Sequence, residues 1–273
     1  MSLIENLDDK LLSKVQIYSG IAFSTFLSTH LATQLSSHFG IQVANSLLKI
    51  TRQYYQFPLY EATAIVASVA IHSISSLLRI AKRNAAAKLL KEEEEKKVNE
   101  KGSPLLTPPV CAGSEKESEK ESEKEKVENI KSDNQVPWDK KLHRIAGYGL
   151  LTFFPGHFIA TRVVPYLAHI TLDWSVTTFT LKEFKYFFFP YYIALGFFGS
   201  YHMAYAFTRV LPLYGYVPSY FHLSRDTFKY CTFLLFATSV SVVLCLGSYY
   251  YHIDINQEEL LKSFVSNLSI KTH

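Results

Sequence analysis

Long uncharged stretches alternate along the chain with charged segments, and the charges gather between residues 79 and 144. A helix of about 20 apolar residues rises roughly 30 Å, which is the thickness of a bilayer's hydrocarbon core. A helix also satisfies its own backbone hydrogen-bonding groups, as lipid requires. The pattern therefore predicts an all-α, multi-pass transmembrane bundle, with spans over Val15–His38, Glu61–Arg79, Leu142–Tyr166, Tyr186–Arg209 and Lys229–Tyr251.

These five spans differ in how clearly the sequence marks them. Glu61 and Arg79 enclose only 17 uncharged residues, so the second span is the shortest. The third span carries Pro155 and Pro165, which predict a kink because proline cannot donate a backbone hydrogen bond. The fifth span is the clearest, and only short polar connections are expected after the first and third.

The charged region between the second and third spans contains two kinds of sequence. Residues 84–100 are rich in Ala, Leu, Glu and Lys, which favours a helix that continues into water. Residues 101–136 contain prolines and the run SEKESEKESEKEK, whose few apolar groups predict disorder. The expected organisation is a first membrane repeat (1–83), a charged linker (84–140), a second membrane repeat (141–251) and a tail (252–273). The tail has one apolar face suited to a membrane surface, formed by Leu260, Leu261, Phe264, Val265 and Leu268.

The two membrane halves align with each other, which indicates an internal duplication with the fifth span added. The first spans align at an offset of 127 residues, and the second spans align at an offset of 130. The matched residues of the first spans are Lys14, Gly20, Thr25, Phe26 and His30 with Lys141, Gly147, Thr152, Phe153 and His157. Those of the second spans are Ala64, His72 and Arg79 with Ala194, His202 and Arg209.

The duplication places one histidine in each repeated span: His30, His72, His157 and His202. An ionisable group inside a membrane is costly and marks a functional position. One interpretation is that the four histidines form two pairs of axial haem ligands, with Gly20, Gly147, Gly196 and Gly199 admitting the flat macrocycle. The alternative is that they form hydrogen bonds between helices or extend to an interface.

Composition excludes several other classes of protein. The net charge of +4 comes with no basic stripe interleaved with aromatic residues, so nucleic-acid binding is not expected. The three cysteines have no disulfide or metal-ligand spacing. Hydrolase, metalloprotease and P-loop motifs are absent from the sequence, and Asp173 has no catalytic neighbours in it, so we expect no enzyme.

Lysine and arginine are densest at the two ends of the linker, where Arg79, Lys82, Arg83, Lys88, Lys140, Lys141 and Arg144 occur. The connection after the first span offers only Lys49 and Arg52. Because basic residues favour the cytosolic side, we expect the linker and the N-terminus there and the tail opposite. The acidic N-terminus resembles neither a secretory signal nor a cleaved matrix presequence.

Several segments resemble a known family. HRIAG (His143–Gly147), within KLHRIAGYGLLTFFPGHFIATR, is similar to the first helix of the cytochrome b membrane anchors of succinate dehydrogenase and fumarate reductase. With IHSISSLLRI (Ile71–Ile80) and YHMAYAFTRVLPLYG, the pattern more closely resembles a fungal branch, the duplicated mitochondrial outer-membrane adapters. The type member of that branch suppresses loss of the ER–mitochondria encounter structure and recruits the large vacuolar-protein-sorting bridge protein that transfers lipid.

The resemblance implies an outer-membrane adapter that recruits this lipid-transfer protein to organelle contacts. The adapters dock it through a Pro-x-Pro element near the N-terminus, which this chain lacks. The nearest candidate is in the linker and consists of Pro104, Leu105, Leu106, Pro108, Pro109 and Val110. One alternative function is haem b binding, which the cytochrome anchors share. Another is a lipid scramblase, with Arg79, Arg162 and Arg209 as polar groups of a lipid groove.

Overall fold

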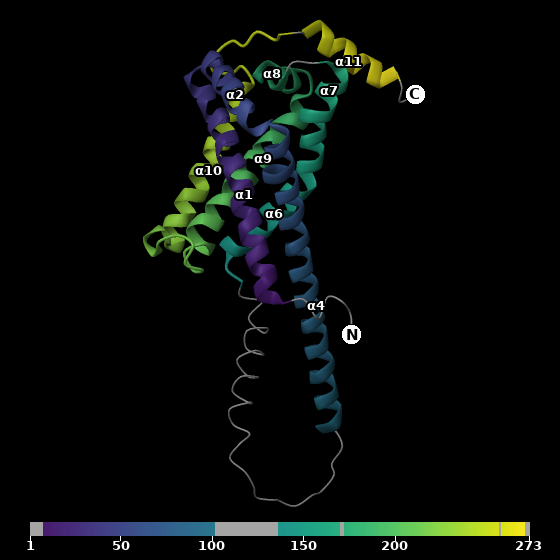
Figure 1. Ribbon diagram of the computed structural model, residues 1–273, viewed down its shortest axis with the longest axis vertical. Coiled ribbons are helices and arrows are strands. Elements are labelled where there is room, and N and C mark those ends of the chain that lie inside the picture. The colour runs from purple at the N-terminus through teal and green to yellow at the C-terminus, as the bar shows by residue number, and fades with distance from the viewer. Residues whose placement is uncertain (1–7, 102–135, 170–171, 257, 271–273) are drawn as a thin grey trace, which may run out of the picture. The chain divides into compact units, whose positions relative to one another are not determined.

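The computed structural model describes residues 8–101, 136–169, 172–256 and 258–270. Across these residues the chain is helical apart from turns and loops, and they contain no strand (Figure 1). The all-α prediction is therefore confirmed. Residues 102–135, which include the candidate docking peptide Pro104–Val110 and nearly all of the segment expected to be disordered, lie outside the described residues.

The chain divides into two compact units, of which the first comprises residues 1–19 and 70–138. It contains the start of α1 (Asp9–Leu35) and most of α4 (Ser68–Lys101). Lys82 donates to Asp9 at 3.0 Å, and Gln16 of α1 bonds to side chains of α4. The helix expected over residues 84–100 is present as the last part of α4.

The second unit comprises residues 20–69 and 139–273 and is built from many more elements. These begin with the rest of α1, followed by the 3-10 turn η1 (Ser36–Phe39), α2 (Ile41–Tyr55), α3 (Pro58–Tyr60) and the π-helical turn η2 (Glu61–Ala67). After the linker come α6 (Trp138–Phe158), the π-helical turn η4 (Ile159–Val163), α7 (Val164–Ala168), α8 (Trp174–Glu183), α9 (Lys185–Tyr205), the π-helical turn η5 (Ala206–Val210), the 3-10 turn η6 (Ser219–Phe221), α10 (Arg225–Leu246) and α11 (Glu258–Ile270).

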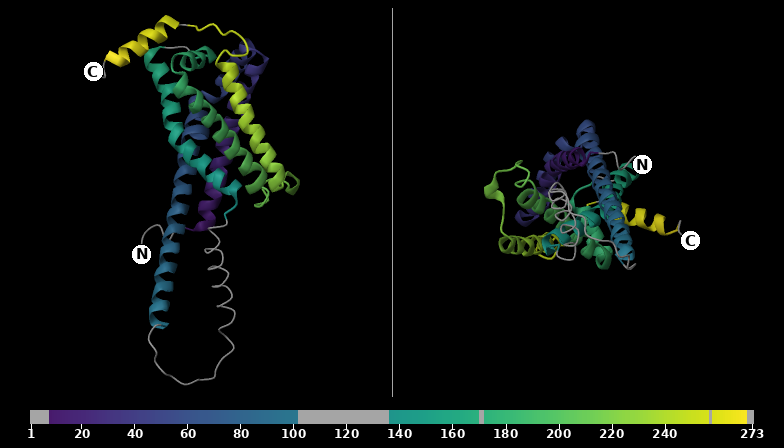
Figure 2. Two further views of the ribbon diagram at one scale, coloured as in Figure 1. Left: turned by 180° about the vertical axis from the view of Figure 1, so that it is seen from behind. Right: turned by 90° about the horizontal axis from the view of Figure 1, so that it is seen from below.

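Helices α9 and α10 pack side by side in the second unit, as Figure 2 shows from behind. Their apolar side chains meet those of α2 and α8 in one core, which contains Ala44, Leu48, Trp174, Leu181, Val242, Val243 and Leu246. The Trp174 indole N–H donates to the carbonyl oxygen of Ala44 at 3.3 Å, and Thr178 donates to that of Leu246 at 2.7 Å. Hydrogen bonds therefore fix α8 to both α2 and the end of α10.

Two helices of the described residues are long and apolar enough to cross a membrane: Pro58–Glu93 and Arg225–Leu246. The second contains most of the span predicted over Lys229–Tyr251, although the helix ends at Leu246. The first contains Glu61–Arg79, which the sequence marked as the shortest span. The stretches predicted as spans one, three and four are helical but fall outside this group. Their polar residues reduce the mean hydropathy of each helix.

The two connections expected to be polar loops are in fact helical, and those predictions were wrong. Residues after the first span form α2, and residues after the third form α8. Asp173, which has no catalytic neighbours in the sequence, caps the start of α8 by accepting from the Ser175 backbone N–H at 2.9 Å. Tertiary packing stabilises both short helices, since each buries its apolar face in the shared core.

The predicted amphipathic tail forms α11. Leu261 is buried against Phe179 of α8, and Val265 packs on the same cluster, so part of the apolar face covers the protein itself. On its exposed side Lys262 donates to Glu258 at 2.6 Å, and this hydrogen bond lowers the pKa of the Glu258 carboxyl.

Candidate functional site: the repeated histidines and their polar partners

His30 of α1 and His157 of α6 come together in the second unit. Their ring centroids lie 6.1 Å apart, and the ring planes are inclined at 66°. The His30 ring also stacks on Phe26, with centroids 5.4 Å apart and planes at 19°. The structure thus brings together the two histidines that the repeat makes equivalent in the first span of each half.

The nitrogen atoms of His30 have unequal surroundings. Its Nε2 lies 3.0 Å from the side-chain amide nitrogen of Gln34. Its Nδ1 is buried and has no hydrogen-bond partner among the described residues. A buried polar atom without a partner is uncommon in folded proteins and points to a missing ligand or water.

The separation of the two rings suits a shared metal ion. Bonds between a metal and imidazole nitrogen are about 2.0 Å long, so one ion between two facing imidazoles places the ring centroids roughly 6 Å apart. Haem iron accepts two such ligands on opposite faces. Gly156, the residue before His157, has nothing within 4 Å of the position that a Cβ atom would occupy, so α6 is open on the side of this glycine. The spacing of the two rings therefore fits bis-histidine haem ligation, although the Gln34 amide donates to the His30 Nε2 and would have to turn away before that nitrogen could bind iron.

His72 lies in the first unit, where Gln16 organises its surroundings. The His72 Nδ1–H donates to the backbone carbonyl oxygen of Gln16 at 2.9 Å. The side chain of Gln16 accepts from Arg79 at 2.5 Å and donates to Ser76 at 2.6 Å. Gln16 therefore joins His72 and Arg79, which are seven residues apart on α4, in one polar cluster.

His202 lies in the second unit and stacks on His143. Their ring centroids are 4.1 Å apart with planes at 15°, and Tyr205 covers His143 at 4.4 Å. The His202 Nδ1–H donates to the backbone carbonyl oxygen of His143 at 3.3 Å. A Cβ atom on Gly147 would lie 3.1 Å from the His202 ring, so glycine at this position lets the imidazole approach the helix backbone.

The contacts of His72 and His202 correspond to each other in the repeat. His72 and His202 are 130 positions apart, and the residues that supply their carbonyl acceptors, Gln16 and His143, are 127 apart. These are the same two offsets at which the spans align in sequence. Donation from Nδ1 to a carbonyl fixes the tautomer and puts the lone pair on Nε2, as is typical of metal-binding histidines.

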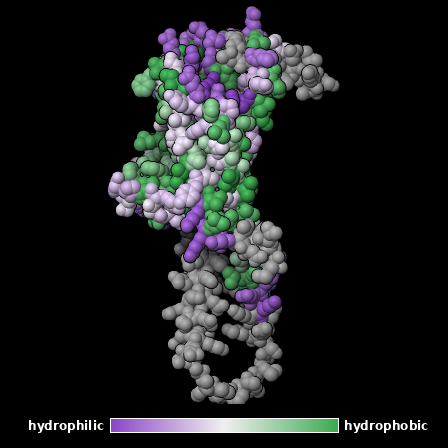
Figure 3. All heavy atoms as spheres, in the orientation of Figure 1, coloured by the Kyte–Doolittle hydropathy of each residue, from purple (hydrophilic) through white to green (hydrophobic). Residues whose placement is uncertain are grey.

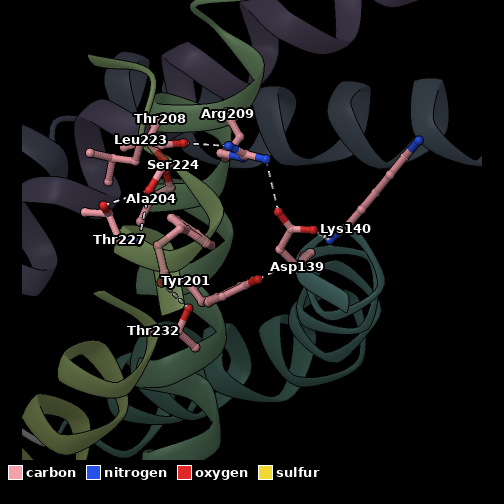
Figure 4. A network of polar contacts seen from close by, with 11 residues as sticks. Asp139, Lys140, Tyr201, Ala204, Thr208, Arg209, Leu223, Ser224, Thr227 and Thr232 are labelled. Carbon is pink, nitrogen blue, oxygen red and sulfur yellow. Dashed lines mark hydrogen bonds and ion pairs between the residues drawn. The ribbon is translucent and has the colours of Figure 1, made fainter. Parts of the chain in front are cut away.

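Two arginines in π-helical turns form ion pairs inside the second unit. Arg162 of η4 donates through two nitrogens to both carboxylate oxygens of Glu61, at 2.5 Å each. Arg209 of η5 lies 3.3 Å from the carboxylate of Asp139 and donates to the carbonyl oxygen of Leu223 at 2.5 Å (Figure 4). Both arginines are therefore held by partners, which differs from the lipid-groove role considered from the sequence.

Asp139 is the centre of the network in Figure 4. It is only 1% exposed, and its backbone carbonyl accepts from the hydroxyl of Tyr201, which is itself fully buried. Lys140 points away from the network. The network joins the start of α6 to α9 and to the loop before α10. It therefore fixes the position of α6 along α9, next to the point where His143 stacks on His202.

Sequence reasoning missed Gln16, His143 as a stacking partner, Asp139 and Tyr201. Gln16 and His143 occupy matched positions at the 127-residue offset, so the alignment itself contained a signal that pointed to them. Three of the four glycines expected to admit a macrocycle face the protein's own side chains instead. Gly147 faces His202, Gly196 faces Ser239 and Gly199 faces Leu27.

Comparisons with known proteins gave no match to a family model, a curated protein or a solved structure.

Proposed function

We propose that the chain is a five-span adapter of the mitochondrial outer membrane that recruits a bridge-type lipid-transfer protein to organelle contacts. The observation that carries the membrane part is the surface of the helices. In the second unit, Tyr186, Phe187, Tyr230, Phe233 and Leu234 are all more than half exposed. In the first unit, Ile71, Ile74 and Leu77 form an exposed apolar stripe on α4.

Exposed apolar side chains at this density suit lipid better than water. Figure 3 shows hydrophobic residues in patches along the helices, between pale and hydrophilic areas. The two candidate spans and the matched contacts of His72 and His202 support two repeated helix pairs with a fifth helix added.

The adapter role is supported by the family resemblance and by the form of α4. This helix begins within an apolar candidate span and continues to Lys101, and its side chains Lys91, Glu92, Glu93, Glu95 and Lys96 are exposed. The candidate docking peptide follows directly in the chain. A membrane anchor that leads into a solvent-exposed arm is the arrangement that recruitment of a large cytosolic partner requires.

Deletion of residues 103–113 from the full-length protein tests the docking peptide. A matched control deletes the next eleven residues, 114–124, whose sequence is SEKESEKESEK. We expect the lipid-transfer protein to leave mitochondria only in the first variant, as seen by fluorescence microscopy and co-purification. Equal recruitment by both variants would exclude this peptide as the docking site.

Location and orientation are tested separately. Protease added to intact mitochondria should cut the linker, which tests the orientation. In a second experiment, the protein should remain in the membrane pellet after extraction with alkaline carbonate. A linker that is cut only after the outer membrane is ruptured would overturn the proposed orientation, and release by carbonate would overturn the membrane proposal.

Haem b binding is a second candidate function, favoured by the separation of the His30 and His157 rings. His30 and His157 would hold the iron, and haem would supply electron-transfer chemistry. The protein purified in detergent after haem supplementation should then show the Soret band of a bis-histidine haem. A protein without that band would end this candidate. The scramblase alternative gains no support, since all three arginines that it invoked contact polar partners.

A further inference from the structure

Helix α2 presents three different faces, two of which are on the surface. The first face is buried in the core of the second unit. Ala44 is fully buried, and Leu48 is 4% exposed in the cluster that contains Trp174 and the end of α10. This face attaches α2 firmly to the unit, so the directions of its other two faces are fixed.

The two surface faces are parallel stripes of opposite character. Exposed or half-buried apolar residues occur at one i, i+4, i+7, i+11 series, which consists of Val43, Leu47, Ile50 and Tyr54. Exposed polar residues occur at a second series with the same spacing, Gln42, Ser46, Lys49 and Gln53. At 3.6 residues per turn, the centres of the two stripes are roughly a quarter to a third of a turn apart.

The apolar stripe is strongly exposed. Val43, Ile50 and Tyr54 are 47%, 53% and 72% exposed, and the stripe continues into Phe57 and Leu59 at 59% and 67%. A helix that faces only water does not need such a stripe, because its outward surface is usually polar or charged.

The position of α2 in the chain and in the fold places it where candidate spans end. Pro58, the first residue of one candidate span, follows Tyr55, the last residue of α2, by three positions. The buried face of α2 packs against Val242, Val243 and Leu246, which form the last turn of the other candidate span. One end of each candidate span therefore lies next to α2.

We infer that α2 is an interfacial helix whose apolar stripe is inserted into one leaflet of the bilayer, while the polar stripe faces water. The partner is the lipid leaflet itself, and the inference rests on the proposed membrane location. Interfacial helices bury their apolar face about 5–10 Å deep, at the boundary between headgroups and acyl chains. Lys49, on the polar stripe, is placed to meet headgroup phosphates.

Two adjacent residues provide a sharp test, because Ile50 and Lys49 belong to different stripes. Single cysteines are introduced as I50C and K49C in a full-length background in which Cys111, Cys231 and Cys245 are replaced by alanine. Each is labelled with a polarity-sensitive fluorophore and reconstituted in phosphatidylcholine vesicles. A nitroxide lipid labelled near the glycerol level should quench position 50 at least about twofold more than position 49, and aqueous iodide should show the reverse order.

V43C and Q42C form a second pair from the same two stripes. They repeat the comparison at another turn of α2, so that a perturbation caused by the label at one site is not mistaken for lipid contact. F233C on α10, a 69% exposed position within a candidate span, is the lipid-facing reference. If F233C is quenched by lipid but positions 50 and 43 respond as 49 and 42 do, the inference fails and the membrane proposal stands. If F233C is also inaccessible to lipid, both fail. Fluorophore self-quenching at position 50 that rises with protein density would overturn the inference in favour of contact between copies.

Discussion

Asp139 and Arg209 form an ion pair in which the carboxylate is almost completely buried. Their side chains are 2% and 15% exposed, and the closest atoms are 3.3 Å apart. Because burial removes both charges from water, each depends on the other for compensation.

The first prediction concerns this pair. Replacing one partner of a buried ion pair leaves the other charge uncompensated and lowers the free energy of unfolding by about 3–5 kcal/mol. We therefore expect D139A to destabilise the protein strongly in a denaturant titration in detergent, and D139A/R209A to recover part of the loss. The control is D226A, which removes an exposed ion pair with Lys229 and should have an effect below about 1 kcal/mol. Equal effects of D139A and D226A would contradict the prediction.

The second prediction addresses the proposed haem ligands. Since His30 and His157 would be the two axial ligands, H30A and H157A should each reduce bound haem by about tenfold or more, because loss of even an outer-shell partner of a metal ligand costs at least that much affinity. Haem per protein is measured by absorption after purification from haem-supplemented cells. The control is H38A, because His38 lies on η1 and bonds to Ser241 at 2.8 Å rather than joining the pair. Haem retention by H30A and H157A at the level of H38A would remove these residues from the site.

The third prediction compares two glycines on α6. A Cβ atom on Gly149 would lie 2.5 Å from the Phe198 ring, whereas one on Gly156 would meet nothing within 4 Å. G149A should therefore lower the unfolding free energy by about 1–3 kcal/mol through overpacking. G156A should be neutral or stabilising by up to about 1 kcal/mol, because alanine restricts the unfolded chain and favours helix.

Thermal unfolding in the same detergent checks the glycine pair. The double variant G149A/F198L should regain part of the lost stability, since leucine leaves room for the new methyl group. Similar melting temperatures for G149A and G156A would show that the ring of Phe198 moves aside freely.

The fourth prediction concerns Gln16 in the first unit. Q16A removes the acceptor of Arg79 and the donor to Ser76 but keeps the backbone carbonyl that His72 uses. Loss of a partner for a half-buried charged group lowers stability by about 1–3 kcal/mol. Q16E keeps an acceptor for Arg79 and should lose less. Q42A changes an exposed glutamine on α2 and is the control in the same denaturant titration; a loss of similar size in Q42A would argue against a special role for Gln16.

The fold could be predicted from the sequence where the signal was long and local. The uncharged stretches gave the long helices, and α10 includes most of its predicted span. By contrast, α2 and α8 are short helices with many polar residues, and they are stabilised by apolar faces that meet each other and α10. Their apolar spacing is visible in the sequence, but nothing local shows that a partner surface exists to bury it.

The candidate site shows the same division. The repeat singled out His30 and His157. It also gave the offsets at which the backbone carbonyls of Gln16 and His143 accept hydrogen bonds from His72 and His202. The pairing of Arg162 with Glu61, 101 residues earlier, had no counterpart in the local pattern. The local pattern also gave no sign that Asp139 is buried, with its backbone carbonyl bonded to Tyr201 and its carboxylate paired with Arg209.

The sequence by itself determined which long segments are helical and apolar, and that an imidazole recurs at matched positions, because hydrophobicity and spacing are properties of neighbouring residues. Only the tertiary structure decided that His30 meets His157 while His202 meets His143, and that the arginines are paired inside the protein. Those outcomes depend on how distant helices rotate and pack against one another. That rotation is set by burial of side chains from many segments at once, which no single stretch of the chain encodes.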